Sequence, residues 1–190
     1  MSFDQGLLVE LMDTFAQAGL EVILIGNAAA IIHGAPLLTR DIDFMVRDHP
    51  QLQKKLKKFA QIYGVTLTRP YEPTSKMIRA VGRPVEVDFL VTIGSGKDFE
   101  SVRSRAMEFK IGKQTMSVAS LEDIIAAKEA AGRQKDKAAL PILKASLRVK
   151  NGYDQEKKQL PKQENLRKSN DDAHKNHHQQ QRQHSRRRRI

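Results

Sequence analysis

The chain has 190 residues, no cysteine and a formal net charge of +11 at neutral pH. This length fits one globular domain with an appendage and leaves too little chain for two full cores. The absence of cysteine excludes a disulfide scaffold, a cysteine nucleophile and a thiolate metal site.

The distribution of charge predicts a domain boundary near Lys150. Residues 151–190 carry 11 basic against five acidic residues and contain only five apolar ones. Such a segment cannot bury enough surface to offset the entropy that ordering removes. We therefore predict one domain over residues 1–150 and a disordered basic tail over 151–190.

The first part of the chain predicts helices that alternate with strands. Apolar residues at helical spacing predict a helix over residues 4–18. Short β-rich runs predict strands over 21–25 and 41–46, and one or two helical turns over 28–32 lie between them. A second amphipathic helix is expected over 50–62.

The second part is rich in strands before it returns to helix. Proline and glycine signals separate five expected strands, over residues 65–69, 76–81, 84–91, 108–111 and 114–118. A helix is expected over 99–106. Ser120 and Asp123 form a capping box that opens a helix ending at Gly132, and a last helix is expected over 134–147. The predicted class is mixed α+β, a small mixed sheet flanked by helices with a helical C-terminal part.

An Asp-x-Asp pair is the most informative chemical feature. Asp41 and Asp43 would share one face of a strand, about 6.6–7 Å apart, and repel each other unless a cation lies between them. Mg²⁺ takes one or two carboxylates and fills its shell with water and substrate phosphates. If the strand of Asp88 is a neighbour, three acids could hold two ions that clamp an in-line phosphoryl displacement. The alternative is that the Asp-x-Asp pair is solvated surface.

Two stretches resemble the DNA polymerase β-like nucleotidyltransferase superfamily. Leu24-Ile25-Gly26-Asn27-Ala28-Ala29 and then Thr39-Arg40-Asp41-Ile42-Asp43-Phe44 give an apolar strand, a glycine turn, a spacer and Asp-x-Asp. Ser120 to Lys128 and Ala131 to Asp136 look like the helix pair after the catalytic sheet of minimal nucleotidyltransferases, including those of toxin–antitoxin systems. The resemblance spans about residues 7–147.

The resemblance implies roles for individual residues. The implied catalytic and metal-binding residues are Asp41, Asp43 and Asp88. Asp88 would also help activate the acceptor hydroxyl. The predicted nucleotide-binding residues are Gly26, Asn27, Arg40 and Lys128. The Gly26-Asn27 turn would direct its backbone amides at the triphosphate, and Asn27 stands where the family usually has glycine or serine.

The resulting prediction is a Mg²⁺-dependent nucleotidyltransferase that moves a nucleoside monophosphate from an NTP such as ATP to a hydroxyl. The basic charge favours RNA, such as a tRNA end, as acceptor, and a protein hydroxyl comes next. A toxin–antitoxin partner protein is a further expected partner. Two alternatives stay open: a nucleotidyltransferase fold kept as a binding module or antitoxin partner without turnover, and a glycosyltransferase that uses Asp-x-Asp.

Several remaining features carry less weight. The longest apolar stretch, over residues 22–32, is too short to span a bilayer, so no membrane contact and a cytoplasmic location are expected. The segment Gly94-Ser95-Gly96-Lys97 lacks the flanking residues of a P-loop and is expected to be a flexible loop. His33 is expected to be packed or capping rather than catalytic. Three basic residues either flank the acceptor groove or are plain surface: Lys76, Arg79 and Arg83.

Overall fold

The computed structural model describes residues 5–72, 74, 75 and 77–153. The chain divides into two units, residues 1–147 and 148–190. Residues 148–153 of the second unit are helical, and the rest of the predicted tail lies outside the described residues. All seven strands in the described ranges belong to the first unit. None of the described helices combines the length and the apolar character that a bilayer crossing requires.

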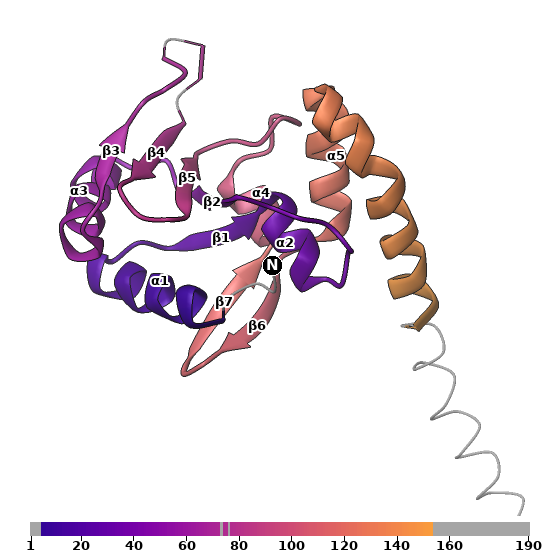
Figure 1. Cartoon of the computed structure of the whole chain (residues 1–190), viewed down its shortest axis with the longest axis horizontal. Coiled ribbons are helices and arrows are strands. Elements are labelled where there is room, and N and C mark those ends of the chain that lie inside the picture. The colour runs from indigo at the N-terminus through magenta and orange to yellow at the C-terminus, as the bar shows by residue number, and fades with distance from the viewer. Residues whose placement is uncertain (1–4, 73, 76, 154–190) are drawn as a thin grey trace, which may run out of the picture. The chain divides into compact units, whose positions relative to one another are not determined.

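A mixed sheet forms the centre of the first unit, with the strand order β3-β4-β5-β2-β1-β7-β6 (Figure 1). Its strands are β1 Val22–Ile25, β2 Asp41–Val46, β3 Thr66–Thr68, β4 Ile78–Val81, β5 Glu86–Leu90, β6 Met107–Ile111 and β7 Gln114–Val118. Strand β2 pairs antiparallel with β1 and parallel with β5, and β1 pairs parallel with β7. The mixed α+β class expected from the sequence is confirmed.

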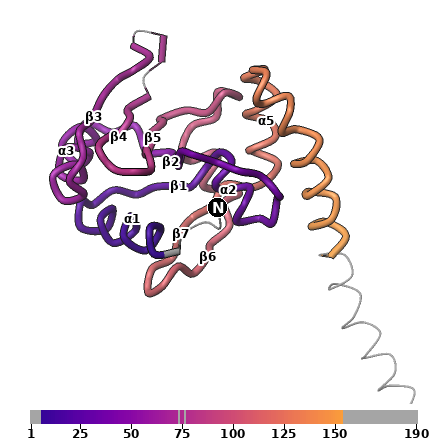
Figure 2. The backbone as a smooth tube through the Cα atoms, in the orientation of Figure 1, coloured from indigo at the N-terminus to yellow at the C-terminus, as the bar shows by residue number. Residues whose placement is uncertain are grey.

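Helices flank this sheet. They are α1 Gln5–Ala18, α2 Gly26–Ile32, α3 Leu52–Tyr63, α4 Phe99–Arg103 and α5 Leu121–Ala131. Residues 134–147 form a further helical run. The chain path shows this run beside α5 (Figure 2), and Lys144 pairs with Glu129 of α5 at 2.7 Å. The predicted helical C-terminal part is therefore present.

Four buried phenylalanines define one face of the sheet, which we call the helix face. The ring of Phe15 in α1 lies 4.8 Å from Phe44 of β2 and 5.0 Å from Phe59 of α3. Phe59 lies 5.2 Å from Phe89 of β5. Aromatic pairs of this kind stabilise a core by about 0.5–1.5 kcal/mol each beyond the area they bury. Helices α1 and α3 therefore close this face.

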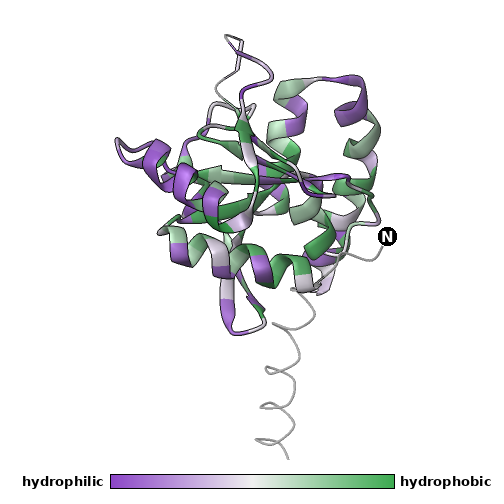
Figure 3. Cartoon of the chain, turned by 60° about the vertical axis from the view of Figure 1, so that its left-hand side comes forward, coloured by the Kyte–Doolittle hydropathy of each residue, from purple (hydrophilic) through white to green (hydrophobic). Residues whose placement is uncertain are grey.

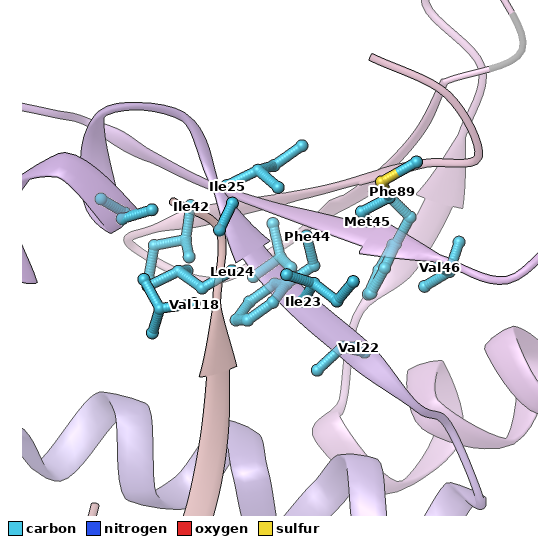
Figure 4. Close-up of a cluster of buried hydrophobic side chains, with 14 of the residues drawn as sticks. Val22, Ile23, Leu24, Ile25, Ile42, Phe44, Met45, Val46, Phe89 and Val118 are labelled. Carbon is cyan, nitrogen blue, oxygen red and sulfur yellow. The ribbon is translucent and has the colours of Figure 1, made fainter. Parts of the chain in front are cut away.

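The apolar side chains of the central strands continue this core. Val22, Ile23, Leu24 and Ile25 of β1 are all buried among those of β2 and β5 (Figure 4). Apolar residues gather on the strands and on the helix sides that face them (Figure 3). A strand buried on both faces reads as a continuous apolar run, which explains the β1 sequence.

The opposite face of β2 and β5 carries acidic side chains at the N-terminal part of both strands, and we call it the acid face. Side chains alternate along a strand, so Asp41 and Asp43 point away from Phe44 and the helix face. The parallel register pairs Asp41 with Glu86 and Asp43 with Asp88. All four carboxylates therefore share the acid face. The strand of Asp88 is indeed the neighbour of the strand that carries Asp41 and Asp43, which the sequence alone left open.

Several expected element boundaries differ from the structure, most of them by one or two residues. The helix expected over 99–106 ends at Arg103, because the amides of Arg105 and Ala106 bond to the carbonyls three residues back and the chain turns toward β6. Helix α2 begins at Gly26 rather than at Ala28. The glycine turn is thus the first turn of a helix.

Candidate functional site

Three carboxylates meet on the acid face. Asp41, Asp43 and Asp88 each offer one oxygen, and these oxygens lie within 4.8 Å of one another. Asp88 is 2% exposed, and the two residues of β2 are half-buried. We call these three residues the acid cluster. Hard oxygen donors in such a group suit Mg²⁺ rather than softer metals.

Gly26 lies directly against this cluster. Its φ of +68° is in the left-handed region, where glycine has no steric penalty. A Cβ atom at this position would lie 2.3 Å from Oδ2 of Asp43. No side chain caps the N-terminus of α2 at Ile25, so the first amides of this helix have no side-chain acceptor. The positive φ and the lack of room for a Cβ atom therefore each require glycine at position 26.

Asn27 and Thr39 hold the segment that leads into β2. The Asn27 Nδ2 donates to the carbonyl of Leu38 at 3.3 Å, and its buried Oδ1 has no hydrogen-bond partner. The Thr39 hydroxyl lies 2.8 Å from the carbonyl and 3.0 Å from the Oδ1 of Asp41. No role was expected for Thr39 from the sequence, although a threonine hydroxyl commonly bonds to backbone groups two residues away.

The electrostatics of the cluster favour a bound cation. Burial and repulsion by Asp41 and Asp88 raise the pKa of Asp43 to about 7, against smaller opposing effects of Lys128 and Lys135. No ion pair within the described ranges includes Asp41 or Asp43. A divalent ion would remove this repulsion, so the residues present fit a metal site.

The three basic residues expected near the groove have different places. Arg79 on β4 binds the Asp88 carboxylate with two nitrogens, each at 2.7 Å. Arg83 instead pairs with Glu10 of α1 at 2.6 Å and lies over the ring of Tyr63. Lys76 lies outside the described residues.

The acid cluster opens into a cleft of about 210 Å³ between the acid face and α5. One wall is apolar and is made by Leu90 at the end of β5, Ile93 after it, and Ile124 and Ala127 of α5. Gly94 packs closely on that helix, because a Cβ atom there would lie 2.7 Å from the carbonyl of Ala127. The cleft therefore combines an anionic floor with an apolar side wall.

Lys128 lines this cleft and is held there by Asp136. Its Nζ lies 3.2 Å from the fully buried Asp136 carboxylate, which Arg133 also binds at 2.6 Å. Burial alone would raise the pKa of Asp136, but the hydrogen bonds from Arg133 and Lys128 outweigh it and lower that pKa. No role was expected for Asp136 from the sequence, although its spacing of three residues from Arg133 suits an ion pair at the start of a helix.

The other predicted residues lie as follows. Arg40 is exposed and is absent from the residues that line the cleft. His33 is packed as expected, with Nε2 at 2.8 Å from the carbonyl of Ala119 and its ring against Phe109. Lys97 binds the buried Asp123 at 2.6 Å, so the Gly94–Lys97 segment is anchored to α5.

Three features together define a nucleotidyltransferase fold. They are a mixed sheet, an Asp-x-Asp pair after a glycine turn, and a third acid on the next parallel strand. The chain belongs to the family described as nucleotidyl transferase of unknown function (DUF2204), whose model matches residues 5–185. This match runs past residue 147, where the resemblance in the sequence ended. The nucleotidyltransferase family predicted from the sequence is thus confirmed.

Two solved structures share the fold. The antibiotic-resistance factor ANT(2'')-Ia is 15% identical, with a TM-score of 0.52 over 75% of this chain and 85% of that one. TM1012, a candidate nucleotidyltransferase from Thermotoga maritima, is 16% identical, with a TM-score of 0.50 over 71% of this chain and 88% of that one. No curated protein matches the chain. Likeness at this identity establishes the fold and leaves the substrates to be inferred.

Proposed function

We propose that this protein is a Mg²⁺-dependent nucleotidyltransferase that transfers a nucleoside monophosphate from an NTP to a hydroxyl group. The observation that carries the proposal is the meeting of three carboxylates within 4.8 Å beside a helix turn that only glycine can make. Family membership supports nucleotidyl transfer as the class of reaction.

Different residues of the cleft would bind different parts of the substrates. Asp41, Asp43 and Asp88 would hold Mg²⁺, which supplies positive charge to the phosphates and to the attacking oxygen. The amides of the Gly26 turn, which no side chain caps, would face the triphosphate. Lys128, which lines the cleft, would contact the phosphates. The apolar wall would receive the base, and Arg40, next to Asp41 in the chain, adds positive charge.

The proposed reaction needs only the two substrates, the metal ion and side chains of the site. The acceptor oxygen forms a bond to the α-phosphorus while the bond from that phosphorus to the bridging oxygen breaks, and pyrophosphate leaves. Asp88 would help to accept the hydroxyl proton. In-line geometry requires the acceptor to enter opposite the pyrophosphate, so the open mouth of the cleft is the proposed acceptor entrance.

We propose RNA, such as a tRNA end, as the acceptor. The net charge of +11 supports attraction to a polyanion, and Arg133 and Lys135 bring positive charge to the cleft lining. A protein hydroxyl is the other outcome that an acceptor assay can return. The proposal places the reaction in the cytoplasm, where NTPs and RNA occur together, and includes a toxin–antitoxin partner protein.

Label transfer tests this function. The protein is incubated with Mg²⁺, total RNA and total protein, and with NTPs labelled at the α- or the γ-phosphate. We expect the α label, and not the γ label, to join the acceptor, and Asp41→Ala to abolish the transfer. Asp48→Ala is the matched control, because Asp48 is an exposed aspartate just after β2. Absence of transfer by the wild type, or equal transfer by Asp41→Ala, contradicts the proposal.

One observation favours a second candidate, a binding module without turnover. The Asn27 amide nitrogen already donates one of its two N–H groups to the carbonyl of Leu38, so the side chain is tied to that segment and only one N–H is left for a phosphate. Calorimetry with an NTP and Mg²⁺ separates the two functions. Binding with no product supports the module, and binding followed by label transfer supports the enzyme.

A further inference from the structure

The acid face carries four carboxylates and one arginine in a fixed arrangement. Asp41 and Asp43 of β2 stand directly opposite Glu86 and Asp88 of β5. On the far side of β5, Arg79 of β4 stands opposite Asp88. Neighbouring strands lie about 4.8 Å apart, so each side chain of this row is within reach of the next. The arginine therefore lies next to the two acids of β5 and not next to the two acids of β2.

Arg79 binds both acids of β5. Its Nε and Nη2 each lie 2.7 Å from the Asp88 carboxylate, and its Nη1 lies 2.8 Å from Glu86. All three guanidinium nitrogens are engaged, in the planar fork that suits bidentate carboxylate binding. The hydrogen bonds to Asp88 also raise the pKa of Arg79, so the group stays charged.

The acids of β2 have no such partner. Within the described part of the chain, no ion pair joins Asp41 or Asp43 to a lysine or arginine. On the acid face, a guanidinium therefore binds the two acids of β5, and the two acids of β2 have no ion-pair partner among the described residues. A second metal ion placed against Asp88 would meet a fixed positive charge at close range, and buried like charges repel strongly.

We propose that Arg79 is a positioning residue that takes the place of a second metal ion, so that the acid cluster without nucleotide binds one divalent ion and not two. This inference rests on the proposed metal-dependent function and deepens it. Arg79 fixes the Asp88 carboxylate by its fork and supplies the positive charge that a second ion would otherwise supply. Asp88 then acts on the reaction from a set orientation.

Counting bound Mn²⁺ tests this proposal without nucleotide and without turnover. Mn²⁺ accepts the same oxygen ligands as Mg²⁺, and the electron paramagnetic resonance signal of free Mn²⁺ reports how much is bound. The full-length protein is titrated at pH 8. We expect one ion per wild-type chain and none with comparable affinity in Asp41→Ala.

Variants of Arg79 separate charge from structure. Arg79→Gln removes the charge and keeps a hydrogen-bond donor, and we expect it to bind two ions per chain. Arg79→Lys keeps the charge, and we expect it to bind one. Arg83→Gln is the matched control and keeps one, because Arg83 pairs with Glu10 of α1 instead.

Each possible ion count either supports or overturns the proposal. Two ions of similar affinity in the wild type, no bound ion in the wild type, or one ion in both wild type and Arg79→Gln overturns the proposal. Should Arg79→Gln fail to fold, the wild-type count and Arg79→Lys still decide it, since two ions in either overturn it. The titration contains no NTP, so its result is independent of the label-transfer assay that tests the proposed function.

Discussion

Two sets of buried or half-buried aspartates in this protein have opposite surroundings. On α5 and the following helical run, Asp123 and Asp136 are each held by two cations, Lys97 and Arg105 for the first. On the acid face, Asp41 and Asp43 form no ion pair with any cation of the described ranges. Burial alone would raise the pKa of Asp123, but hydrogen bonds from Arg105 and Lys97 outweigh it and lower that pKa, whereas the pKa of Asp43 rises to about 7.

This difference separates acids that form ion pairs within the structure from the acids that we propose to bind a metal ion. Leaving carboxylates near each other without a cation opposes folding, and such strain is typical of functional sites. The compensated acids near α5 instead anchor the cleft wall. Asp88 lies between the two sets, since it belongs to the acid cluster and is held by Arg79.

Gly26→Ala should break the acid face most severely. The new Cβ would clash with Oδ2 of Asp43, so we expect Mn²⁺ affinity and label transfer to fall by more than about 100-fold, beyond the loss typical of a ligand's supporting residues. Gly64→Ala is the matched control. Its φ of +72° is similar, but nothing lies within 4 Å of the new atom. It should lose about 1–2 kcal/mol of stability and keep metal binding; equal loss of metal binding in both variants would contradict this account.

The pH dependence of stability should report the strain at Asp43. Its pKa is about 7 when folded and 3.8 in its ordinary state. Between these values the folded protein holds a proton that the unfolded chain has lost. The contribution of Asp43 to the free energy of unfolding therefore falls as pH rises, by about 1.4 kcal/mol per pH unit, and is constant above the folded pKa.

Asp43→Asn removes this dependence. Without metal, the variant should gain stability relative to the wild type as pH rises from 4 to about 7. Urea unfolding of both proteins across that range measures the difference. A difference that does not change with pH would show that Asp43 is ionised throughout and would remove the evidence for strain.

Asp123→Asn should test the compensated set. The variant keeps the shape of the side chain and loses the charge that Lys97 and Arg105 bind. Hydrogen bonds to charged groups contribute roughly 1.5–3 kcal/mol, and we expect a loss of stability of that size. Asp48→Asn, at an exposed position, should change stability little. A stable Asp123→Asn protein would show that these cations do not anchor the loop to α5.

Asn27→Ser should have the smallest effect. The change restores the residue usual in the family that the sequence resembles and removes the hydrogen bond to Leu38. That bond is 3.3 Å long and exposed, so we expect stability to fall by less than about 1 kcal/mol. Label transfer should stay within about tenfold of the wild type, which is the change that 1.4 kcal/mol would produce. A larger change in transfer would show that Asn27 acts on the nucleotide directly.

Local signals in the sequence predicted much of the fold. Strand β2 has the expected bounds, Asp41–Val46, because its apolar and acidic residues alternate. Helix α5 begins after Ser120, whose side chain accepts a hydrogen bond from the amide of Asp123, and ends at Gly132 in the left-handed conformation. Both depend on residues only a few positions apart.

The features that the sequence analysis missed depend on register and packing. The Arg79–Asp88 pair exists because β4 and β5 pair in a register that places these residues opposite each other, and the sequence of neither strand alone shows this pairing. Asp136 becomes buried only when the helical run after Gly132 packs near α5. Such distant contacts leave little trace in local residue patterns.

Anomalous scattering from crystals grown with Mn²⁺ and a non-hydrolysable NTP tests the central claim most directly. We predict a Mn²⁺ peak bound by the carboxylates of Asp41 and Asp43, with the triphosphate beside the Gly26 turn. A nucleotide bound elsewhere, or Mn²⁺ bound only at Asp123 or Asp136, would contradict the account.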